Sequence, residues 1–198
     1  MHEHHMNSDG HGQKKPSRGP SSFFMHNPDS VFTELELKPG DTFLDVGCGP
    51  GEYALYASKE VGPSGVVYAL DKWQRMIEIL TEEATSQGLE NIKTVLCDII
   101  GRLPLKDKCV DVCLIATVLH SLNLARDGKT LFSEIHRVLK PHGRLAIINC
   151  KKEDQPFGPP KHKRLSPQQT EALITPHGFT KLSLIDLGYN YMIQFSVR

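Results

Sequence analysis

Residues 44–51 read Leu-Asp-Val-Gly-Cys-Gly-Pro-Gly, and this stretch decides the predicted fold. A second apolar run, residues 66–70, is followed by a carboxylate, Asp71, twenty residues beyond Gly51. A glycine-rich turn between a strand and a helix lets the backbone approach a ligand closely, and an acid at the tip of the next strand can accept both hydroxyls of a ribose. Together the two features predict a site for a ligand that carries a nucleoside.

The spacing of the glycines indicates which kind of nucleoside to expect. Dinucleotide-binding folds use the pattern G-x-G-x-x-G, which lets a pyrophosphate rest on a helix N-terminus. Here the glycines are Gly47, Gly49 and Gly51, and Glu52 stands where the third dinucleotide glycine would fall. A pyrophosphate would meet this carboxylate, so a ligand without phosphate suits the site better.

Bulk composition predicts a single domain and gives no reason to expect a polyanionic partner, with a local charged patch left open. The chain has 198 residues, and its 23 Lys and Arg residues balance its 23 Asp and Glu residues. A balanced charge gives no overall field to attract nucleic acid or an anionic membrane. No apolar signal region and no run of about 18 apolar residues is present, so a membrane span is not expected. Five cysteines without a C-x-x-C pair are typical of reduced thiols and predict a cytoplasmic location.

The first 22 residues differ from the rest of the chain. They contain His2, His4, His5 and His11 and almost nothing apolar, so we expect residues 1–22 to form a histidine-rich arm that is disordered when free. The histidines lack the i, i+4 spacing of a helical metal site, and no cysteine accompanies them. A solvated tail and a metal-binding segment both remain open for the arm. No metal ligands are predicted in the domain over residues 23–198.

From residue 42 onward, predicted strands and helices alternate. Strands are expected over residues 43–46, 66–70, 93–97, 110–116 and 144–149, and helices over residues 52–61, 74–87, around 131–138 and over 167–176. Two further β-rich runs, residues 182–187 and 191–197, flank a three-residue connection and predict an antiparallel hairpin. This order predicts an α/β fold with a doubly wound, Rossmann-like seven-stranded sheet, parallel except for the antiparallel C-terminal hairpin.

The chain resembles the class I S-adenosylmethionine-dependent methyltransferases of the small single-domain type, similar to the ubiquinone/menaquinone and arsenite methyltransferase group. The resemblance covers residues 27–198 and rests on several landmarks in the expected order. These are the acidic residue and G-x-G-x-G turn over residues 45–51, Asp71, Cys97-Asp98-Ile99, Leu103-Pro104-Leu105 and residues 138–143. It implies a methyltransferase whose cofactor is S-adenosyl-L-methionine.

The resemblance also implies which residues bind that cofactor: Asp45, Gly47, Gly49, Gly51, Asp71, Trp73, Asp98 and Ile99. The glycines would line the methionine part with Asp45 near its amine, and Asp71 would hold the ribose hydroxyls. Asp98 would accept from the adenine amino group, with Ile99 and Trp73 against the ring faces, and residues 23–26 would cover the cofactor from the other side. Simpler alternatives stay open: a tight turn without a ligand, a helix cap at Asp98, and an ordinary core or surface aromatic at Trp73.

A sulfonium is already an activated methyl donor, so the protein mainly has to align an acceptor in a dry pocket. Residues 116–121, at the end of the fourth parallel strand, lack the Asn/Asp-Pro-Pro-Tyr motif of amino-directed nucleic-acid methylases. His120 in this segment resembles a histidine of many small-molecule members and is the candidate general base; alternatively it only lines the pocket. Residues 151–164 form a basic, Pro-rich loop over the expected acceptor mouth, which is either a binding loop for an anionic acceptor or a solvated face.

Two functions from different classes follow. The first is an S-adenosylmethionine-dependent methyltransferase that acts on a small-molecule acceptor rather than nucleic acid, as a monomer or homodimer. The rival is a non-catalytic nucleoside- or metal-binding protein that uses the histidine-rich arm. An arsenite acceptor would need converging thiols, whereas Cys109 and Cys113 lie too far apart along one strand and Cys150 has no evident partner.

Overall fold

The computed structural model describes residues 21–198. The predicted histidine-rich arm therefore lies outside the described residues, except for its last two, and its disorder stays a prediction. Ser21 caps a short 3₁₀ helix, η1 (Ser22–Met25), and Ser22 is buried. The folded domain thus begins slightly before residue 23.

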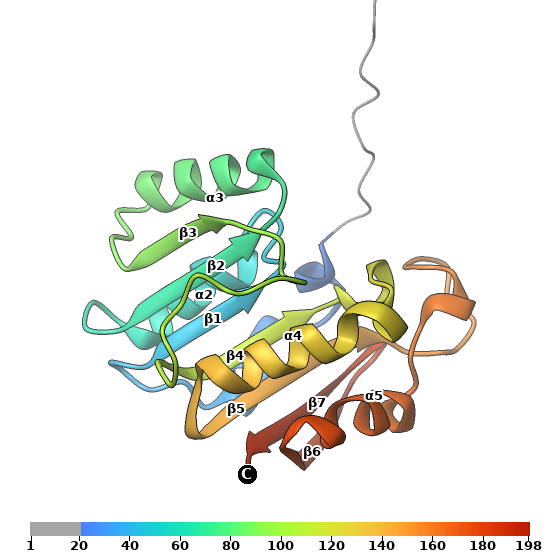
Figure 1. The fold of residues 1–198 in the computed structure, drawn as a ribbon. Coiled ribbons are helices and arrows are strands. Elements are labelled where there is room, and N and C mark those ends of the chain that lie inside the picture. Colours follow the sequence, from blue (N-terminus) through green and yellow to red (C-terminus); the bar gives the residue numbers. More distant parts are fainter. Residues whose placement is uncertain (1–20) are drawn as a thin grey trace, which may run out of the picture.

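In the described part of the chain, seven strands form a single sheet with the order β3-β2-β1-β4-β5-β7-β6 (Figure 1). The strands from β3 to β5 run parallel, whereas β7 pairs antiparallel with both β5 and β6. The predicted doubly wound, Rossmann-like sheet with an antiparallel C-terminal hairpin is confirmed. The strands are β1 (Thr42–Val46), β2 (Val66–Asp71), β3 (Ile92–Leu96), β4 (Val110–Ala116), β5 (Leu139–Cys150), β6 (Phe179–Leu187) and β7 (Asn190–Val197).

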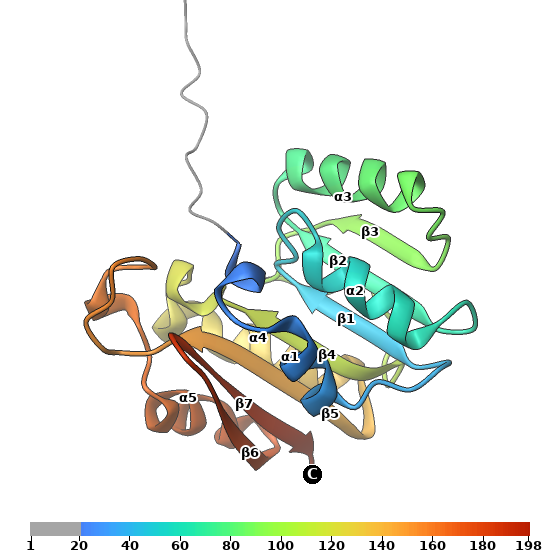
Figure 2. The ribbon, with the colours of Figure 1, turned by 180° about the vertical axis from the view of Figure 1, so that it is seen from behind.

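Helices cover both faces of the sheet because its strands present apolar side chains on two sides. In β4, for example, Leu114 and Ile115 belong to different buried clusters on opposite faces. One face carries α1 (Pro28–Leu35), α2 (Glu52–Val61) and α3 (Gln74–Ser86) (Figure 2), and the other carries α4 (Leu124–Val138) and α5 (Pro167–Ile174) (Figure 1). None of the helices in residues 21–198 is long and apolar enough to cross a membrane.

Local signals in the sequence set the starts of two helices. The Asn27 side chain accepts a hydrogen bond from the Asp29 amide at 2.9 Å, and Pro28 occupies the first turn of α1. Ser166 and Gln169 form a reciprocal capping box at the start of α5. Both starts agree with the sequence prediction because capping depends on residues that are close in the chain.

Several strand boundaries differ from the sequence prediction; β6, for example, begins at Phe179 and not at residue 182. β5 begins at Leu139, directly after α4, because Leu139 pairs with Val110 before a bulge in the ladder. β7 begins at Asn190, which pairs with Leu187, so the hairpin connection has two residues rather than three. In both places the backbone ladder continues through polar residues, which an apolar pattern does not reveal.

The direction of winding reverses between β1 and β4. The chain builds β1, β2 and β3 outward in one direction, and the segment after β3 crosses back so that β4 pairs with the other edge of β1. In open α/β sheets, ligands bind outside the carboxyl ends of the strands at such a switch point. The predicted site residues follow β1, β2, β3 and β4, so the topology brings them to this edge of the sheet.

Candidate active site

The segment after β1 forms a tight turn that leads directly into α2. The amides of Gly47 and Cys48 both donate to the carbonyl of Leu70, at 2.7 and 2.9 Å, and thereby fasten the turn to the end of β2. The Gly51 carbonyl accepts from the Leu55 amide at 2.8 Å, as one of the first bonds of α2. The predicted strand–turn–helix unit is therefore present.

Gly47 and Gly51 are required by the backbone and by packing against protein side chains. Their φ angles are 73° and 95°, values that side chains of L-residues rarely allow. A Cβ on Gly47 would lie 2.6 Å from Cγ2 of Val118, and a Cβ on Gly51 would lie 2.3 Å from Cδ1 of Leu80. The sequence predicted room for a ligand at this turn, and the structure shows that neighbouring side chains also close on it.

Asp71 connects the glycine turn after β1 with the segment that follows β2. Its Oδ2 accepts from the Gly49 amide at 2.9 Å, and its Oδ1 accepts from the Trp73 amide at 2.9 Å. The side chain is 5% exposed at the end of β2. A carboxylate offers about four lone-pair positions, so two remain for further donors. Asp71 is thus held in place by the backbone and still able to accept from a ligand.

Asp45 is a buried carboxyl with an unsatisfied oxygen. The residue is 1% exposed near the end of β1, and its Oδ2 has no hydrogen-bond partner. Burial, and then the nearby charges of Asp71 and Glu52, together raise the pKa of Asp45 from 3.8 to about 8. Three acidic groups therefore surround the glycine turn, an environment that favours a cationic ligand group and opposes a pyrophosphate.

The residues predicted for the adenine side lie after β2 and β3. Asp98 is exposed, and its Oδ1 accepts from the Ile100 amide at 3.2 Å, which makes it a local turn residue with a solvent-facing carboxylate. Ile99 is buried in the cluster beneath α4. Trp73 is 52% exposed at the N-terminus of α3, where the Lys72 ammonium lies 5.5 Å from its ring centre. These three positions flank the same end of the sheet as Asp71.

The segment Ser21–His26 links the start of α2 to the end of β4, a contact that the sequence did not predict. Ser21 Oγ donates to Glu52 Oε2 at 3.1 Å, and Thr117 Oγ1 donates to Ser22 Oγ at 3.0 Å. Nε2 of His26 lies 2.9 Å from the Tyr53 hydroxyl, and burial lowers the pKa of His26 to about 4. This segment therefore covers the sheet edge with an uncharged histidine at neutral pH.

Thr117, directly after β4, has a strained backbone. Its φ is 52°, which is rare for a β-branched residue. Its amide donates to the Ile148 carbonyl at 2.7 Å, and its hydroxyl holds Ser22 as described above. Strain of this kind is concentrated at functional sites, where surrounding contacts maintain it. The turn it creates directs the chain into η2 (Leu119–Ser121), which carries His120.

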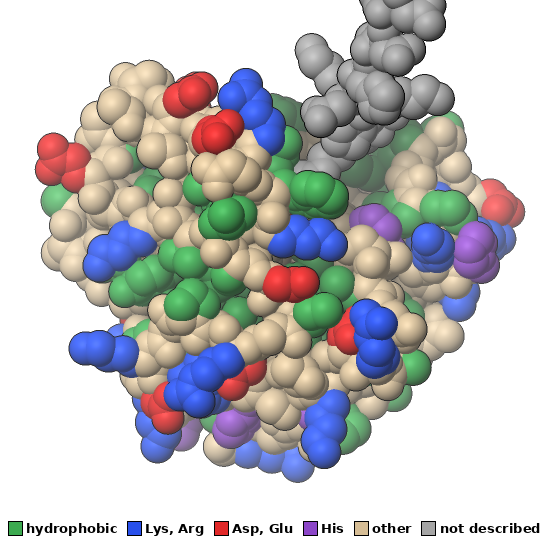
Figure 3. Space-filling view, turned by 45° about the horizontal axis from the view of Figure 1, so that its top comes forward, with side chains coloured by type: hydrophobic (Ala, Val, Ile, Leu, Met, Phe, Trp, Pro, Cys, Tyr) green, Lys and Arg blue, Asp and Glu red, His purple; other side chains and the backbone are tan. Residues whose placement is uncertain are grey.

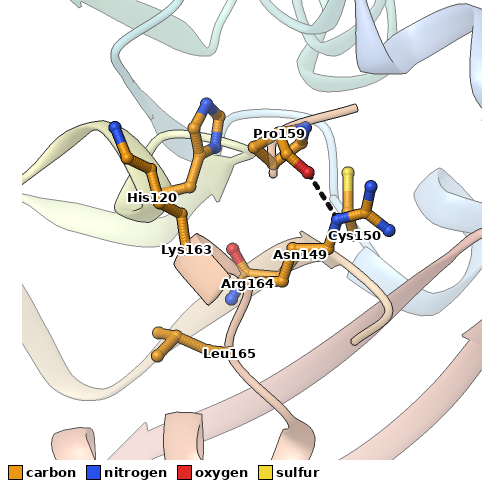
Figure 4. Close-up of a pocket in the computed structure, with 7 residues that line it drawn as sticks. All are labelled: His120, Asn149, Cys150, Pro159, Lys163, Arg164 and Leu165. Carbon is orange, nitrogen blue, oxygen red and sulfur yellow. Dashed lines mark hydrogen bonds between the residues drawn. The ribbon is translucent and has the colours of Figure 1, made fainter. Parts of the chain in front are cut away.

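His120 borders a small hollow between the ends of β4 and β5 (Figure 4). The hollow is narrow and has room for only about a water-sized group. Burial, and then the charge of Lys163, lower the pKa of His120 from 6.5, so the imidazole is neutral at pH 7. The lining residues are His120, Asn149, Cys150, Pro159, Lys163, Arg164 and Leu165.

Arg164 fixes the loop that follows β5. Its guanidinium is 6% exposed and donates to the backbone carbonyls of Lys151, Glu153, Phe157 and Pro159 at 2.6 to 3.2 Å. The loop over residues 151–164, predicted as a cover for the acceptor mouth, is therefore tied to the hollow by a buried side chain. The sequence gave no sign of this role, because an arginine within a basic run is more often solvated.

The thiols do not converge on one point. Within residues 21–198, no group of three or more His, Cys, Asp or Glu side chains is placed to hold a metal ion. Cys150 and Cys48 are buried at different strand ends, and burial raises the pKa of each thiol. The possible metal-binding role of the histidine-rich arm falls outside the described residues.

Comparison with known proteins agrees with this geometry. Residues 37–182 match the family described as a methyltransferase domain. The chain belongs to this family. The same methyltransferase fold occurs in the crystal structure of an S-adenosylmethionine-dependent methyltransferase from Aquifex aeolicus, with a TM-score of 0.83, 32% identity and coverage of 91% of this chain and 94% of that one. The predicted resemblance is therefore confirmed, and with it the cofactor of the family, S-adenosylmethionine.

Curated methyltransferases match over shorter stretches. An arsenite methyltransferase of Halobacterium salinarum is 38% identical over 111 residues, which cover 56% of this chain and 27% of the relative. A demethylmenaquinone methyltransferase of Lactobacillus johnsonii is 33% identical over 126 residues, covering 64% of this chain and 50% of the relative. The chain thus spans half or less of these relatives, which carry different acceptors in their names.

Proposed function

We propose that this methyltransferase transfers a methyl group from S-adenosylmethionine to a small-molecule acceptor. The cofactor would lie over the carboxyl ends of β1 and β2, and the acceptor would enter beside the ends of β4 and β5. The observation that carries this proposal is the unpartnered Oδ2 of Asp45, buried beside the glycine turn. A buried acid without a partner is costly unless a ligand supplies one.

The residues present fit the cofactor. The ammonium of its methionine end would pair with Asp45, whose ionised form is disfavoured while the site holds no cation. The ribose hydroxyls would donate to the remaining lone pairs of Asp71, and the adenine amino group to Asp98. Trp73 and the small exposed part of Ile99 would contact the ring. These assignments rest on the positions of the side chains after β1, β2 and β3.

When bound, S-adenosylmethionine supplies a methyl group on a sulfonium, which needs no further activation. The protein has to exclude water and aim the acceptor atom along the sulfur–methyl bond. The segment Ser21–His26 and the loop over residues 151–164 both cover this edge of the sheet and would exclude water. His120 is neutral at pH 7 and half-buried beside the hollow, so its free ring nitrogen would take the proton from an acceptor that loses one.

No specific acceptor among those of the relatives is favoured. An arsenite acceptor would need several thiols at one point, and Cys150 is the only cysteine that lines the hollow within the described residues. The rival function, a nucleoside- or metal-binding protein that relies on the histidine-rich arm, has no support in residues 21–198. We therefore propose small-molecule methylation without naming the acceptor atom.

Calorimetric titration with S-adenosylhomocysteine tests the proposal. The full-length protein should bind the nucleoside at a single site, whereas Asp71→Ala should lose most of the affinity. Deleting residues 1–20 should leave the binding unchanged. Binding that is absent from the full-length protein, or lost only when the arm is deleted, would contradict the proposed function.

A further inference from the structure

We propose that the hollow between β4 and β5 binds an anionic group of the methyl acceptor, so that the substrate is a small organic anion such as a carboxylate. This inference rests on the proposed function, because it assigns the substrate class of the same site. Two observations support it: two cations without carboxylate partners, and an amide oxygen without a donor.

The first observation is an excess of positive charge. Lys163 and Arg164 both line the hollow, and neither forms an ion pair within the described residues. By contrast, Lys151 and Lys161 of the same loop pair with Asp186 and Asp154. The Arg164 guanidinium has only neutral carbonyl partners, so its charge is solvated by dipoles and not cancelled. An anion entering the hollow would meet two uncompensated positive charges.

The two cations line the same hollow, so a single anionic group of a ligand could contact both. Figure 4 shows the side chains of Lys163 and His120 lying next to each other on one side of the hollow, with Cys150 and the Arg164 guanidinium across from them. Figure 3 shows basic and His side chains close together at the side of the molecule that this loop forms, with an acidic side chain beside them. Residues 151–164 contain five Lys and Arg residues and two acidic residues, so this loop carries an excess of positive charge although the whole chain is electrically balanced.

The second observation is Asn149, at the end of β5. Its side chain is buried, and its Nδ2 donates to Thr170 Oγ1 at 3.4 Å and to the Tyr191 hydroxyl at 3.3 Å. These two bonds fix the orientation of the amide, and Oδ1 has no partner among residues 21–198. An acceptor that is held in this way and left without a donor is suited to an N–H or O–H donor of the ligand. The acceptor molecule would thus carry a donor close to its anionic group.

The size of the hollow limits what can enter it. Because it has room for only about a water-sized group, it would admit no more than the polar tip of a molecule, with the remainder directed toward the cofactor. His120 is uncharged and neither repels nor attracts an anion. Lys163 is therefore the accessible cation at the rim of the hollow.

Matched acid and amide probes test the substrate class. Protein saturated with S-adenosylhomocysteine is titrated with 4-hydroxybenzoate and with 4-hydroxybenzamide at pH 7.5, and binding is followed by ligand-observed NMR. We expect the carboxylate to bind about two- to fivefold more tightly than the amide, in line with a partly exposed charge pair. Increasing the salt concentration should reduce this preference.

Two substitutions in the loop distinguish a direct contact of the anion with Lys163 from a general effect of the loop's positive charge. Lys163→Gln should abolish the preference for the carboxylate, whereas Lys161→Gln, which removes an equal charge from an existing ion pair, should retain it. Both variants should bind S-adenosylhomocysteine as the wild type does. Equal binding of acid and amide, no detectable binding of the acid, or a preference that survives Lys163→Gln would overturn the inference. A protein that fails to bind S-adenosylhomocysteine would instead overturn the proposed function.

A third variant tests the amide. Asn149→Asp keeps the shape of the side chain but places a negative charge beside the hollow. It should lose carboxylate binding while retaining S-adenosylhomocysteine binding, which also shows that it is folded. Carboxylate binding unchanged in Asn149→Asp would show that the anion lies elsewhere.

Discussion

Replacing Asp45 with asparagine is expected to stabilise the ligand-free protein and to weaken its binding of S-adenosylhomocysteine. The carboxyl is 1% exposed, its Oδ2 has no partner, and its pKa is raised from 3.8 to about 8, chiefly by burial. One pKa unit corresponds to about 1.4 kcal/mol, so the full shift amounts to about 6 kcal/mol of destabilisation when the acid ionises. Relaxation and water entry reduce such penalties, and we expect a gain of about 2 to 3 kcal/mol at pH 8.

The sign of the pH dependence follows from the direction of this shift. Because the folded pKa of Asp45 is higher than the unfolded one, the folded state holds the proton more tightly between about pH 4 and pH 8. Within this window the free energy of unfolding of the wild type falls as pH rises, and the neutral amide of Asp45→Asn does not share this loss. The stability difference between variant and wild type should therefore grow from pH 5 to pH 8.

Urea denaturation of both proteins at pH 5, 6.5 and 8, followed by circular dichroism, measures this difference. Calorimetry with S-adenosylhomocysteine at pH 8 should show at least about tenfold weaker binding to Asp45→Asn, because a charge-assisted hydrogen bond contributes about 1.5 to 3 kcal/mol. A variant that is less stable than the wild type at every pH, or a stability difference that is independent of pH, would refute the reasoning.

Asp71→Asn is the matched control, because Asp71 is also a buried acid at a strand end. Both of its oxygens accept from backbone amides, of Gly49 and Trp73, and an asparagine can accept from only one of them. This variant should be destabilised by about 1 to 3 kcal/mol. Opposite effects of the two substitutions would distinguish an unsatisfied acid from a satisfied one.

Four further predictions concern the same edge of the sheet. In calorimetry, Asp71→Ala should weaken S-adenosylhomocysteine binding far more than His120→Ala does. Equal losses of affinity would show that the pocket lies elsewhere. Gly51→Ala should lose about 2 kcal/mol or more in urea unfolding through its φ of 95° and its clash with Leu80, and the loss should be smaller in a Leu80→Ala background. Arg164→Met should accelerate proteolysis within residues 151–163 without altering nucleoside affinity; unchanged cleavage would show that the guanidinium does not hold the loop. If His120 is the base, kcat/KM should stay constant down to a pH below 6.5, since its pKa is lowered, and His120→Gln should remove the acidic limb.

The fold and the glycine turn were predictable because their signals are local. Capping at Asn27 and Ser166 depends on neighbours in the chain. The glycine spacing in residues 44–51, with Asp71 after the next strand, is by itself enough to predict the strand–turn–helix unit. The sequence did not, however, reveal that Gly51 is also needed to admit Leu80, because that contact depends on how α3 packs against α2.

The acceptor side could not be predicted in the same way. The bond between Thr117 and Ser22 joins residues 95 positions apart, and the orientation of Asn149 depends on Thr170 and Tyr191 from other elements. Arg164 belongs to a basic run that suggests a solvated face, yet the fold buries its guanidinium among backbone carbonyls. Such roles arise from tertiary contacts and have no signature in residue spacing.

A crystal structure of the protein with S-adenosylhomocysteine tests the placement of the cofactor most directly. The nucleoside is expected at the carboxyl ends of β1 and β2, with its ribose hydroxyls within hydrogen-bond distance of Asp71 and its amino group on Oδ2 of Asp45. A nucleoside bound elsewhere, or a crevice that stays closed by Val118 and the segment Ser21–His26 in crystals soaked to saturation, would contradict this placement.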